Sequence, residues 1–350
     1  MIVQPARTRQ GSEFSLDLER ASAGRIWIVR MLGQSGIEVS DIGFGAWAIG
    51  GPIVARGKPA GWGDVDDEES IAAVHRALEL GITFFDTADV YGTGHSERVL
   101  GRALAGRRDD VVIATKFGNT YDEASRTLTG SDVSAEYIRR ACRASLDRLD
   151  TDRIDLYQLH CDARLAQVDD ILATLEGLAD EGLIRAYGWS TDDPDKAAAF
   201  AKGPRCAATQ HVLNVFEDFP AMLAICDNHD LASINRAPLA MGLLGGRYGP
   251  DSRLPMNDVR GDSPAWVTYF IDGRPAPEFL HRLDAIRGIL TSGGRTLAQG
   301  ALSWLLARSP RTVPIPGIRT PTQAADNAGT LRNGPLSPTQ LTEVSRLLNR

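Results

Sequence analysis

Short apolar runs alternate with longer amphipathic stretches along most of the chain. The runs are rich in β-branched and aromatic residues, as in Ile82-Thr-Phe-Phe85, which is typical of buried strands. In the longer stretches apolar residues recur at helical spacing; residues 70–80, for example, follow this pattern and stop at Gly81. This reading predicts strands at 42–48, 82–85, 111–115, 154–159, 183–189, 207–210, 231–235 and 312–315, and helices at 70–80, 96–104, 134–149, 168–180, 194–200, 220–228, 296–307 and 321–328.

The order of these elements predicts an α/β fold with a single (β/α)8 TIM barrel, because no Gly/Ser-rich linker or change of composition divides the chain. A doubly wound sheet would need about six strands and a nucleotide loop after the first. We expect residues 1–30 to form a poorly ordered N-terminal extension and residues 31–350 to form the barrel. The Gly- and Pro-rich stretch 244–276 is too long for a plain connection and is expected to act as a lid.

Side chains that could begin helices refine these boundaries. Ser96 and Ser134 each precede a predicted helix and are expected to cap its N-terminus. Pro194 follows two aspartates and suits the first turn of the helix that it opens.

Composition narrows the class of protein. The 350 residues carry 38 Lys+Arg and 45 Asp+Glu, a net charge of −7, which argues against nucleic acid as the main partner. The four cysteines form no C-x-x-C pair, and the six histidines form no H-x-H or H-x-x-x-H cluster, so we predict reduced thiols and no metal site. Without a signal sequence or about 18 consecutive apolar residues, the protein is expected to be cytoplasmic, with no membrane partner.

Residues 43–48, with the sequence G-F-G-A-W-A, match the G-x-G-x-x-G/A fingerprint of dinucleotide-binding domains. That fingerprint requires a preceding strand and an immediately following helix, whose N-terminus holds the pyrophosphate. Here loop-like composition continues from Ile49 to Gly63. We therefore interpret the run as a glycine-rich strand end that passes close to a ligand or a neighbouring backbone.

Polar side chains gather just after the predicted strands, which in a barrel is where the active site lies. One of only four lysines, Lys116, is among them. A carboxylate, a phenol, an amine and an imidazole at one end of a barrel are hard to explain by packing alone. The set comprises Asp86, Thr87, Asp89 and Tyr91 after the second strand, Lys116 after the third, His160 after the fourth, Ser190 after the fifth, and Gln210 and Asn214 after the sixth.

These groups together match the needs of a general acid. A tyrosine pKa of about 10 is high for proton donation, but a nearby ammonium favours the phenolate and is expected to lower that pKa. A carboxylate can hold the lysine in position, and an imidazole can direct a carbonyl oxygen toward the phenol. Such an apparatus protonates an alkoxide as it forms, so the carbon needs a hydride from a cofactor.

From about Leu32 to Asn327 the chain resembles the aldo-keto reductase superfamily, in its bacterial type. Six motifs in the family's order and spacing carry the resemblance, which implies a barrel enzyme that reduces carbonyl groups with NADPH. The motifs are L-G-x-S-G-x-x-V-S-x-I-G-F-G at 32–45, F-D-T-A-D-V-Y-G-T-G-H-S-E-x-x-L-G at 85–101, I-A-T-K at 113–116, L-D-R-L-D-T-D-R-I-D-L-Y-Q-L-H at 146–160, G-W-S at 188–190 and I-P-G-I-R-T-P-T-Q-A-A-D-N at 315–327.

The resemblance also implies functional residues. The catalytic tetrad would be Asp86, Tyr91, Lys116 and His160, with Tyr91 as the general acid. The cofactor NADPH/NADP+ would lie across the barrel mouth. NADPH is favoured over NADH because the guanidinium of Arg319 offers a fixed fork of donors to a 2′-phosphate. The implied cofactor contacts are Trp47, Asp86, Ser190 and Gln210 at the nicotinamide end, Arg236, Leu239, Gly242, Leu244 and Arg247 after the seventh strand, and Gly317, Arg319, Gln323 and Asn327 at the adenosine end.

The substrate pocket is expected beside Trp47, Trp62, Tyr91 and His160. Loops 53–63, 119–131 and 244–276 would decide which small-molecule carbonyl compound is accepted. Their mixture of aromatic and charged residues points to no single substrate.

Three positions bear on the details of this resemblance. Thr191 stands where many relatives have an asparagine, which leaves one amide contact open. Arg236 stands where many have an aromatic residue that stacks on the nicotinamide; its guanidinium can stack there or reach a phosphate. His160 is retained, whereas relatives that reduce carbon–carbon double bonds of steroids replace it, so C=O reduction is favoured.

The sequence therefore predicts a reversible NADPH-dependent carbonyl reductase, in which Tyr91 donates the proton with help from Lys116, Asp86 and His160. The alternative is a cofactor-binding regulatory or redox-sensing subunit with little turnover. A Schiff-base lyase that uses Lys116 would leave the motif at 315–327 unexplained. The substrate, the physiological direction and the oligomeric state stay open.

Overall fold

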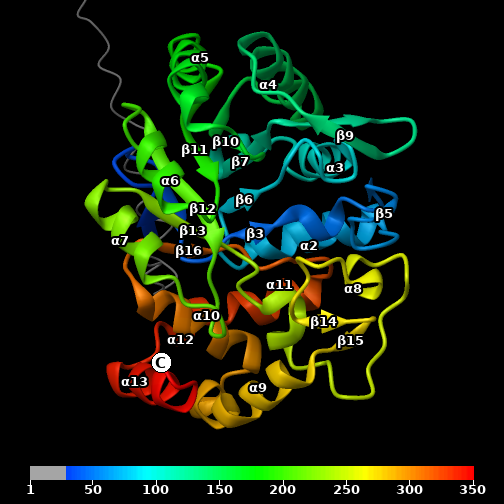
Figure 1. Ribbon diagram of the computed structural model, residues 1–350, viewed down its shortest axis with the longest axis vertical. Helices are drawn as coiled ribbons and strands as arrows, with labels where there is room; N and C mark the ends of the chain where they lie inside the picture. Colours follow the sequence, from blue (N-terminus) through cyan, green and yellow to red (C-terminus); the bar gives the residue numbers. More distant parts are fainter. Residues whose placement is uncertain (1–28) are drawn as a thin grey trace, which may run out of the picture.

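The computed structural model describes residues 29–350, and in it eight parallel strands form a barrel surrounded by helices (Figure 1). Backbone hydrogen bonds from Gly43 N to Pro314 O (2.8 Å) and from Gly45 N to Pro316 O (2.9 Å) join the first strand to the last and close the barrel. The predicted (β/α)8 fold is confirmed. In order around the barrel the strands are β3 (Phe44–Gly45), β6 (Phe84–Asp86), β7 (Val112–Phe117), β10 (Ile154–Leu159), β11 (Ile184–Ser190), β12 (Cys206–Val212), β13 (Ala232–Arg236) and β16 (Thr312–Pro314).

Eight helices alternate with these strands and cover the outside of the barrel. They are α2 (Asp67–Glu79), α3 (His95–Ala103), α4 (Ala135–Leu149), α5 (Val168–Asp180), α6 (Pro194–Phe200), α7 (Pro220–Asn228), α10 (Leu297–Arg308) and α11 (Pro321–Ala328). The bounds predicted for α5, α6, α7 and α11 are those observed. None of the helices within residues 29–350 is long and apolar enough to cross a membrane.

Helices α2 and α3 begin before the residues predicted for them. The residue before α3 is Gly94, with φ 90°, so Ser96 is not the cap but lies inside the helix. Its hydroxyl donates to Ala46 O (2.9 Å) and accepts from Thr87 Oγ1 (2.8 Å), contacts that only the folded chain creates. Helix α2 begins three residues earlier than predicted because Asp66 accepts a hydrogen bond from Glu69 N (3.0 Å).

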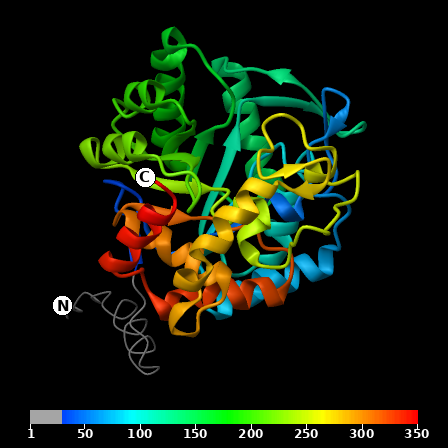
Figure 2. The same cartoon turned by 60° about the horizontal axis from the view of Figure 1, so that its bottom comes forward.

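Additional helices follow the barrel's seventh and eighth strands. They are α8 (Val259–Asp262), α9 (Pro277–Leu290), α12 (Thr330–Asn333) and α13 (Pro338–Leu347). Helices α9 and α13 pack together and against α10, and Figure 2 shows these orange and red helices side by side. Neither α9 nor α13 was among the helices predicted from the hydrophobic pattern.

A hairpin precedes the barrel, formed by β1 (Val29–Met31) and β2 (Glu38–Ser40). Its buried side chains, Leu32, Ile37 and Val39, belong to the same apolar cluster as the side chains inside the barrel. Of the predicted extension, residues 1–28 lie outside the described residues, and the last two residues form part of β1.

The side chains that point into the barrel are apolar in its centre and polar at its mouth, two residues further along each strand. Alternate residues of a strand point to the same side, so Phe84, Ala114 and Leu156 fill the interior as one apolar layer. Two residues further along the same strands come Asp86, Lys116 and Gln158, and in β12 Gln210 follows Ala208 in the same way. The strand period thus places a polar layer at the barrel mouth, directly above the packed core.

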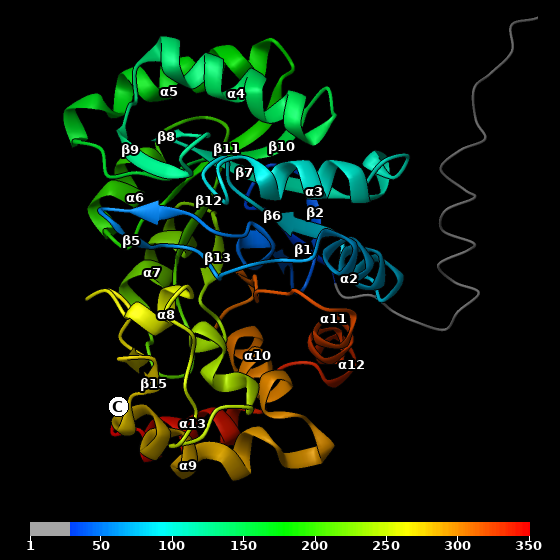
Figure 3. The ribbon, with the colours of Figure 1, turned by 90° about the vertical axis from the view of Figure 1, so that its right-hand side faces the viewer.

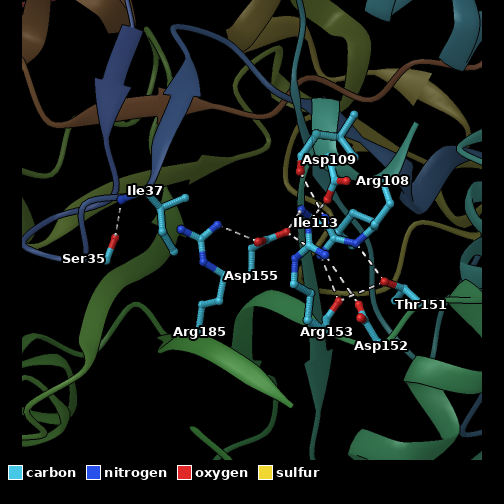
Figure 4. A network of polar contacts seen from close by, with 11 residues as sticks. Ser35, Ile37, Arg108, Asp109, Ile113, Thr151, Asp152, Arg153, Asp155 and Arg185 are labelled. Atoms are coloured by element: carbon cyan, nitrogen blue, oxygen red, sulfur yellow. Dashed lines mark hydrogen bonds and ion pairs between the residues drawn. The ribbon is translucent and has the colours of Figure 1, made fainter. Parts of the chain in front are cut away.

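The opposite end of the barrel holds a network of ion pairs around Asp155 (Figure 4). Its carboxylate is fully buried and accepts from Arg108 Nη2 (2.7 Å), Arg185 Nη1 (2.9 Å) and Ile113 N (2.9 Å). Arg108 also donates to Thr151 Oγ1 (2.8 Å). This network ties neighbouring strands together at the base of the barrel.

The segments predicted as long loops fold into small sheets beside the mouth. Strands β4 (Val54–Ala55), β5 (Lys58–Pro59), β8 (Asn119–Asp122) and β9 (Thr127–Ser131) form one sheet, and β14 (Phe270–Ile271) and β15 (Arg274–Pro275) form a hairpin. Figure 3 shows β5, β8 and β9 on the same side of the barrel. A hydrogen bond from Val259 N to Gly61 O (2.8 Å) joins the stretch 244–276 to the loop 53–63. The stretch 244–276 is therefore anchored to the neighbouring loop rather than hanging free.

Candidate active site

Lys116 occupies the centre of the polar layer at the barrel mouth. Its side chain is fully buried, and Nζ donates to Asp86 Oδ1 (2.5 Å), Thr87 O (2.7 Å) and Tyr91 OH (3.2 Å). Burial disfavours the charge, but Asp86 and Tyr91 outweigh burial and raise the pKa of Lys116. Lys116 is therefore an ammonium group, and all three of its donors are in use.

Tyr91 differs in one respect from the sequence interpretation. Burial raises the pKa of Tyr91 above 10, and although Lys116 acts in the opposite direction, the net shift is upward. The expected lowering of this pKa in the protein alone is therefore wrong, because desolvation of the phenolate exceeds the attraction of the ammonium. Tyr91 consequently keeps its proton at neutral pH and can donate it.

His160 follows directly after β10 and faces the same cavity as Tyr91. The two rings meet edge to face, with centroids 5.7 Å apart. Burial lowers the pKa of His160 well below 6.5, and the charges of Lys116 and Arg236 lower it further. Its Nδ1 is buried and has no hydrogen-bond partner in residues 29–350. His160 is therefore a neutral imidazole, and the described part of the protein does not satisfy the hydrogen-bonding capacity of its Nδ1.

Two glutamines complete the layer around Asp86. Asp86 Oδ2 accepts from Gln158 Nε2 (3.0 Å) and from Gln210 Nε2 (2.8 Å), while its Oδ1 accepts from Lys116. Sequence reasoning did not single out Gln158. Its signal was a polar residue inside the otherwise apolar core of β10, two positions before His160 and therefore on the same face. The amides orient Asp86, which in turn holds Lys116 beside Tyr91.

The turn that carries Tyr91 is anchored from below by a buried acidic group. Glu97 is fully buried, accepts from Thr115 Oγ1 (2.6 Å) and pairs with Arg148 Nε (2.6 Å). Asp89, in the same turn, is also buried, and burial and the nearby Glu97 raise its pKa well above the usual 3.8. The contacts of Glu97 fix the first turn of α3, which directly follows the segment that carries Tyr91.

Aromatic rings form one wall of the cavity. Trp47 stacks on Tyr91 with ring centroids 6.0 Å apart, and it also contacts Trp62 (5.1 Å) and Trp266 (6.2 Å). The resemblance implied Trp47, Trp62 and Tyr91 as parts of one pocket, and the structure brings their side chains together. The side chains of Asn119 and Leu128, from the small sheet beside the mouth, line the same space.

One cavity of about 580 Å³ runs from Tyr91 and His160 to the start of α11. At that far end lie Gly317, Arg319 and Gln323. The guanidinium of Arg319 donates to Trp62 O (3.1 Å) and Asp64 O (2.6 Å), so it links the last βα loop to the loop that carries Trp62. The site thus has a phenol and an imidazole at one end and a guanidinium at the other.

Most of the residues implied by the resemblance line this cavity, and three do not. Leu244 is fully buried in the apolar core between the helices, and Asn327 is buried within α11. Lys116 lies behind the cavity wall, where it donates hydrogen bonds to two residues of that wall, Asp86 and Tyr91. The residues that line the cavity are Trp47, Trp62, Asp86, Tyr91, His160, Ser190, Gln210, Arg236, Leu239, Gly242, Arg247, Gly317, Arg319 and Gln323.

The two departures from the family pattern have distinct surroundings. The Thr191 hydroxyl accepts from Asp193 N (3.1 Å) and shapes the turn before α6. Arg236, the last residue of β13, lines the cavity and pairs with Asp192. The ion pair with Asp192 is neither of the two roles expected for Arg236, which were to stack on the nicotinamide or to reach a phosphate.

The aldo/keto reductase family model matches residues 41–349. Aldo-keto reductase YhdN of Bacillus subtilis is 30% identical over 300 residues, which cover 83% of this chain and 85% of that protein. The structure of a glycerol dehydrogenase from Gluconobacter oxydans matches with 29% identity and a TM-score of 0.77, covering 92% of this chain and 95% of that one. An aldo-keto reductase from Klebsiella pneumoniae, solved in complex with NADPH, matches with 25% identity and a TM-score of 0.66, also covering 92% and 95%.

Proposed function

The chain belongs to the aldo/keto reductase family, and on that basis we propose that it reduces an aldehyde or ketone to an alcohol with NADPH, reversibly. The observation that carries the proposal is the contact of Lys116 Nζ with both Asp86 Oδ1 (2.5 Å) and Tyr91 OH (3.2 Å) at one end of an elongated cavity. A protonated phenol beside an ammonium is a general acid poised for a developing alkoxide.

The residues that line the cavity fit NADPH. Both side-chain hydrogen bonds of Gln210 run through Nε2, which leaves its Oε1 to accept from a carboxamide. Ser190 lies beside Gln210 at the end of β11. At the far end Arg319 offers a planar fork of donors for a 2′-phosphate. The complex of the Klebsiella pneumoniae relative with NADPH supports this assignment. When bound, the reduced nicotinamide supplies the hydride that the carbonyl carbon needs.

The chain's own residues then orient the substrate and move the proton. His160, as a neutral imidazole protonated on Nε2, donates to the carbonyl oxygen and directs it toward Tyr91. Tyr91 OH transfers its proton to that oxygen as negative charge develops there. Lys116 stabilises the resulting phenolate, and Asp86, held by Gln158 and Gln210, keeps Lys116 in place. In the oxidative direction the same groups act in reverse, with the phenolate accepting the proton.

The protonation state of Lys116 weighs against a Schiff-base lyase. A lysine that forms a Schiff base must attack as a neutral amine, which requires a lowered pKa. Here Asp86 and Tyr91 raise the pKa of Lys116, against the effect of burial, and its three donors have partners.

The proposal is tested by following NADPH absorbance with a panel of aldehydes and ketones, in both directions. Tyr91→Phe removes the proton donor but keeps the ring that stacks on Trp47, so turnover should fall about a thousandfold. The dissociation constant of NADPH should stay within about twofold. An unchanged rate in this variant would contradict the mechanism, and absence of NADPH binding in the wild type would contradict the cofactor.

A further inference from the structure

A cation stands at the end of the cavity where the amide and hydroxyl groups lie. Arg236 is the last residue of β13, opposite Val212 in β12, and its side chain is 40% exposed. It lines the same cavity as Tyr91, His160, Ser190 and Gln210. The other arginines of that lining lie outside the strands: Arg247 and Arg319 in loops, and Arg260 in α8.

The partner of this cation is fixed in the fold. Asp192 Oδ2 pairs with the Arg236 guanidinium, and Asp192 Oδ1 accepts from Val212 N (2.8 Å). The carboxylate is therefore tied to the strand next to Arg236, on the loop between β11 and α6. Because Asp192 binds both the backbone of β12 and the Arg236 guanidinium, the guanidinium is held at the cavity wall.

The positive charge, rather than its partner, faces the reactive groups. Burial dominates the pKa of Tyr91 and of His160, and behind it Arg236 contributes to both as a nearby positive charge. In His160 the other contributing charge is Lys116. Asp192, in contrast, is not among the described residues that line the cavity. Of this pair, therefore, only the positively charged member lines the cavity.

A positive field distinguishes the two redox forms of a nicotinamide. The oxidised ring carries a positive charge and the reduced ring is neutral, while the phosphates are the same in both. We propose that Arg236 makes the site bind NADPH more tightly than NADP+, with Asp192 limiting the size of this preference. The inference rests on the proposed function, because it takes Ser190 and Gln210 as the place of the nicotinamide.

Substitutions at the pair give effects of opposite sign. The quantity to measure is the ratio of the dissociation constant of NADP+ to that of NADPH. Arg236→Gln removes the cation, and we expect this ratio to fall about fivefold. Asp192→Asn keeps a hydrogen-bonding group but removes the negative charge, so the ratio should rise. Arg236→Lys keeps the charge and should leave the ratio within about twofold of the wild type.

Both constants can be obtained by quenching of the protein's tryptophan fluorescence, which needs no turnover. Titrations at low and high salt add a further check, because the preference should shrink as salt screens the partly exposed pair. Arg319→Gln is the matched control: it removes a cation that faces a part common to both nucleotides. That variant should weaken the binding of both and leave their ratio unchanged.

Three results would overturn the inference. An equal weakening of both nucleotides in Arg236→Gln would show that the arginine acts as a contact and not through its charge. No change in either constant would show that the charge of Arg236 has no part in nucleotide binding. If the wild type bound neither nucleotide, the proposed function itself would fail, and this result differs from the first two because it appears before any substitution is made.

Discussion

The two ends of the barrel use buried charge in opposite ways. At the base, Asp155 is surrounded by Arg108, Arg185 and the amide of Ile113, and both carboxylate oxygens have partners within 2.9 Å (Figure 4). At the mouth, Lys116 is just as deeply buried, but one of its three partners is Tyr91, a group that can itself gain or lose a proton.

The difference lies in what each end leaves incomplete. The donors and acceptors at the base pair with one another, as in a network that holds strands together. At the mouth, His160 Nδ1 and Asp89 Oδ1 are buried without partners in the described chain, and burial shifts the pKa of both residues. Groups that the fold leaves unsatisfied, with displaced pKa values, are typical of a reactive site. Removing a charge should therefore cost stability at the base and activity at the mouth.

Lys116→Met is expected to have the largest effect, a loss of about a thousandfold in kcat/KM for carbonyl reduction. Methionine fills a similar volume but cannot stabilise the phenolate of Tyr91. The measurement is steady-state NADPH oxidation, with circular dichroism to verify folding. Lys196→Met is the control, because Lys196 pairs with the exposed Asp162, and it should retain nearly full activity. Equal losses of kcat/KM in the two variants would contradict a specific role of Lys116 in catalysis.

Asp155→Asn should lower the free energy of unfolding by about 3 kcal/mol, because it breaks a buried ion pair and leaves Arg108 without an anionic partner. The activity per folded molecule should not change. Urea denaturation followed by fluorescence measures the first quantity, and kcat at low temperature the second. Asp109→Asn changes an exposed partner of Arg153 and should leave stability the same. If Asp155→Asn stayed as stable as the wild type but lost turnover, the base of the barrel would serve activity and not stability, contrary to the comparison of the two ends.

Arg319→Gln tests the far end of the mouth, where a cation that lines the cavity also links two loops. We expect the dissociation constant of NADPH to rise about tenfold, the effect of losing a charge-assisted fork of hydrogen bonds to a phosphate. NADH lacks the 2′-phosphate and should bind with little change. Titration of both nucleotides by fluorescence provides the measurement. A similar loss for NADH would instead assign Arg319 to holding the Trp62 loop, through its contacts with Trp62 O and Asp64 O.

The smallest expected effect is that of pH on reduction. In the proposed mechanism, reduction needs Tyr91 protonated and His160 neutral. Burial raises the pKa of Tyr91 above 10 and lowers that of His160 below 6.5. Between about pH 7 and about pH 9, kcat/KM should therefore vary by less than about twofold, and it should fall above about pH 10 as Tyr91 loses its proton. Alcohol oxidation needs a proton acceptor, so its rate should rise with pH over the same range. An apparent pKa between 7 and 9 in the reductive profile would contradict this assignment.

The alternation of strands and helices was readable from the sequence because each element has its own hydrophobic period. Helices α5, α6, α7 and α11 were predicted with the bounds that the structure shows. The elements that were missed or shifted depend on contacts between distant segments. Ser96 looks like a cap in the sequence, but its hydroxyl bonds to Ala46 O, fifty positions away, and Gly94 begins the helix instead.

The candidate site shows the same division. Residues at strand ends could be selected from the sequence, since the barrel brings all eight ends together, and the motifs pointed to Asp86, Tyr91, Lys116 and His160. Gln158 was overlooked because a single glutamine in an apolar run has no distinctive local pattern. Its role appears only when the register sets it opposite Lys116 and within 3.0 Å of Asp86.

The sequence by itself determined the barrel, the family and the types of side chain at its mouth, because these follow from local periodicity and from short motifs. Only the tertiary structure decided the electrostatics. The direction in which the pKa of Tyr91 moves depends on how completely water is excluded around it, and burial exceeds the effect of Lys116. Likewise, the pairing of Arg236 with Asp192 depends on how neighbouring strands are placed. Desolvation and the distances between charges are properties of the packed chain, and no single segment contains them.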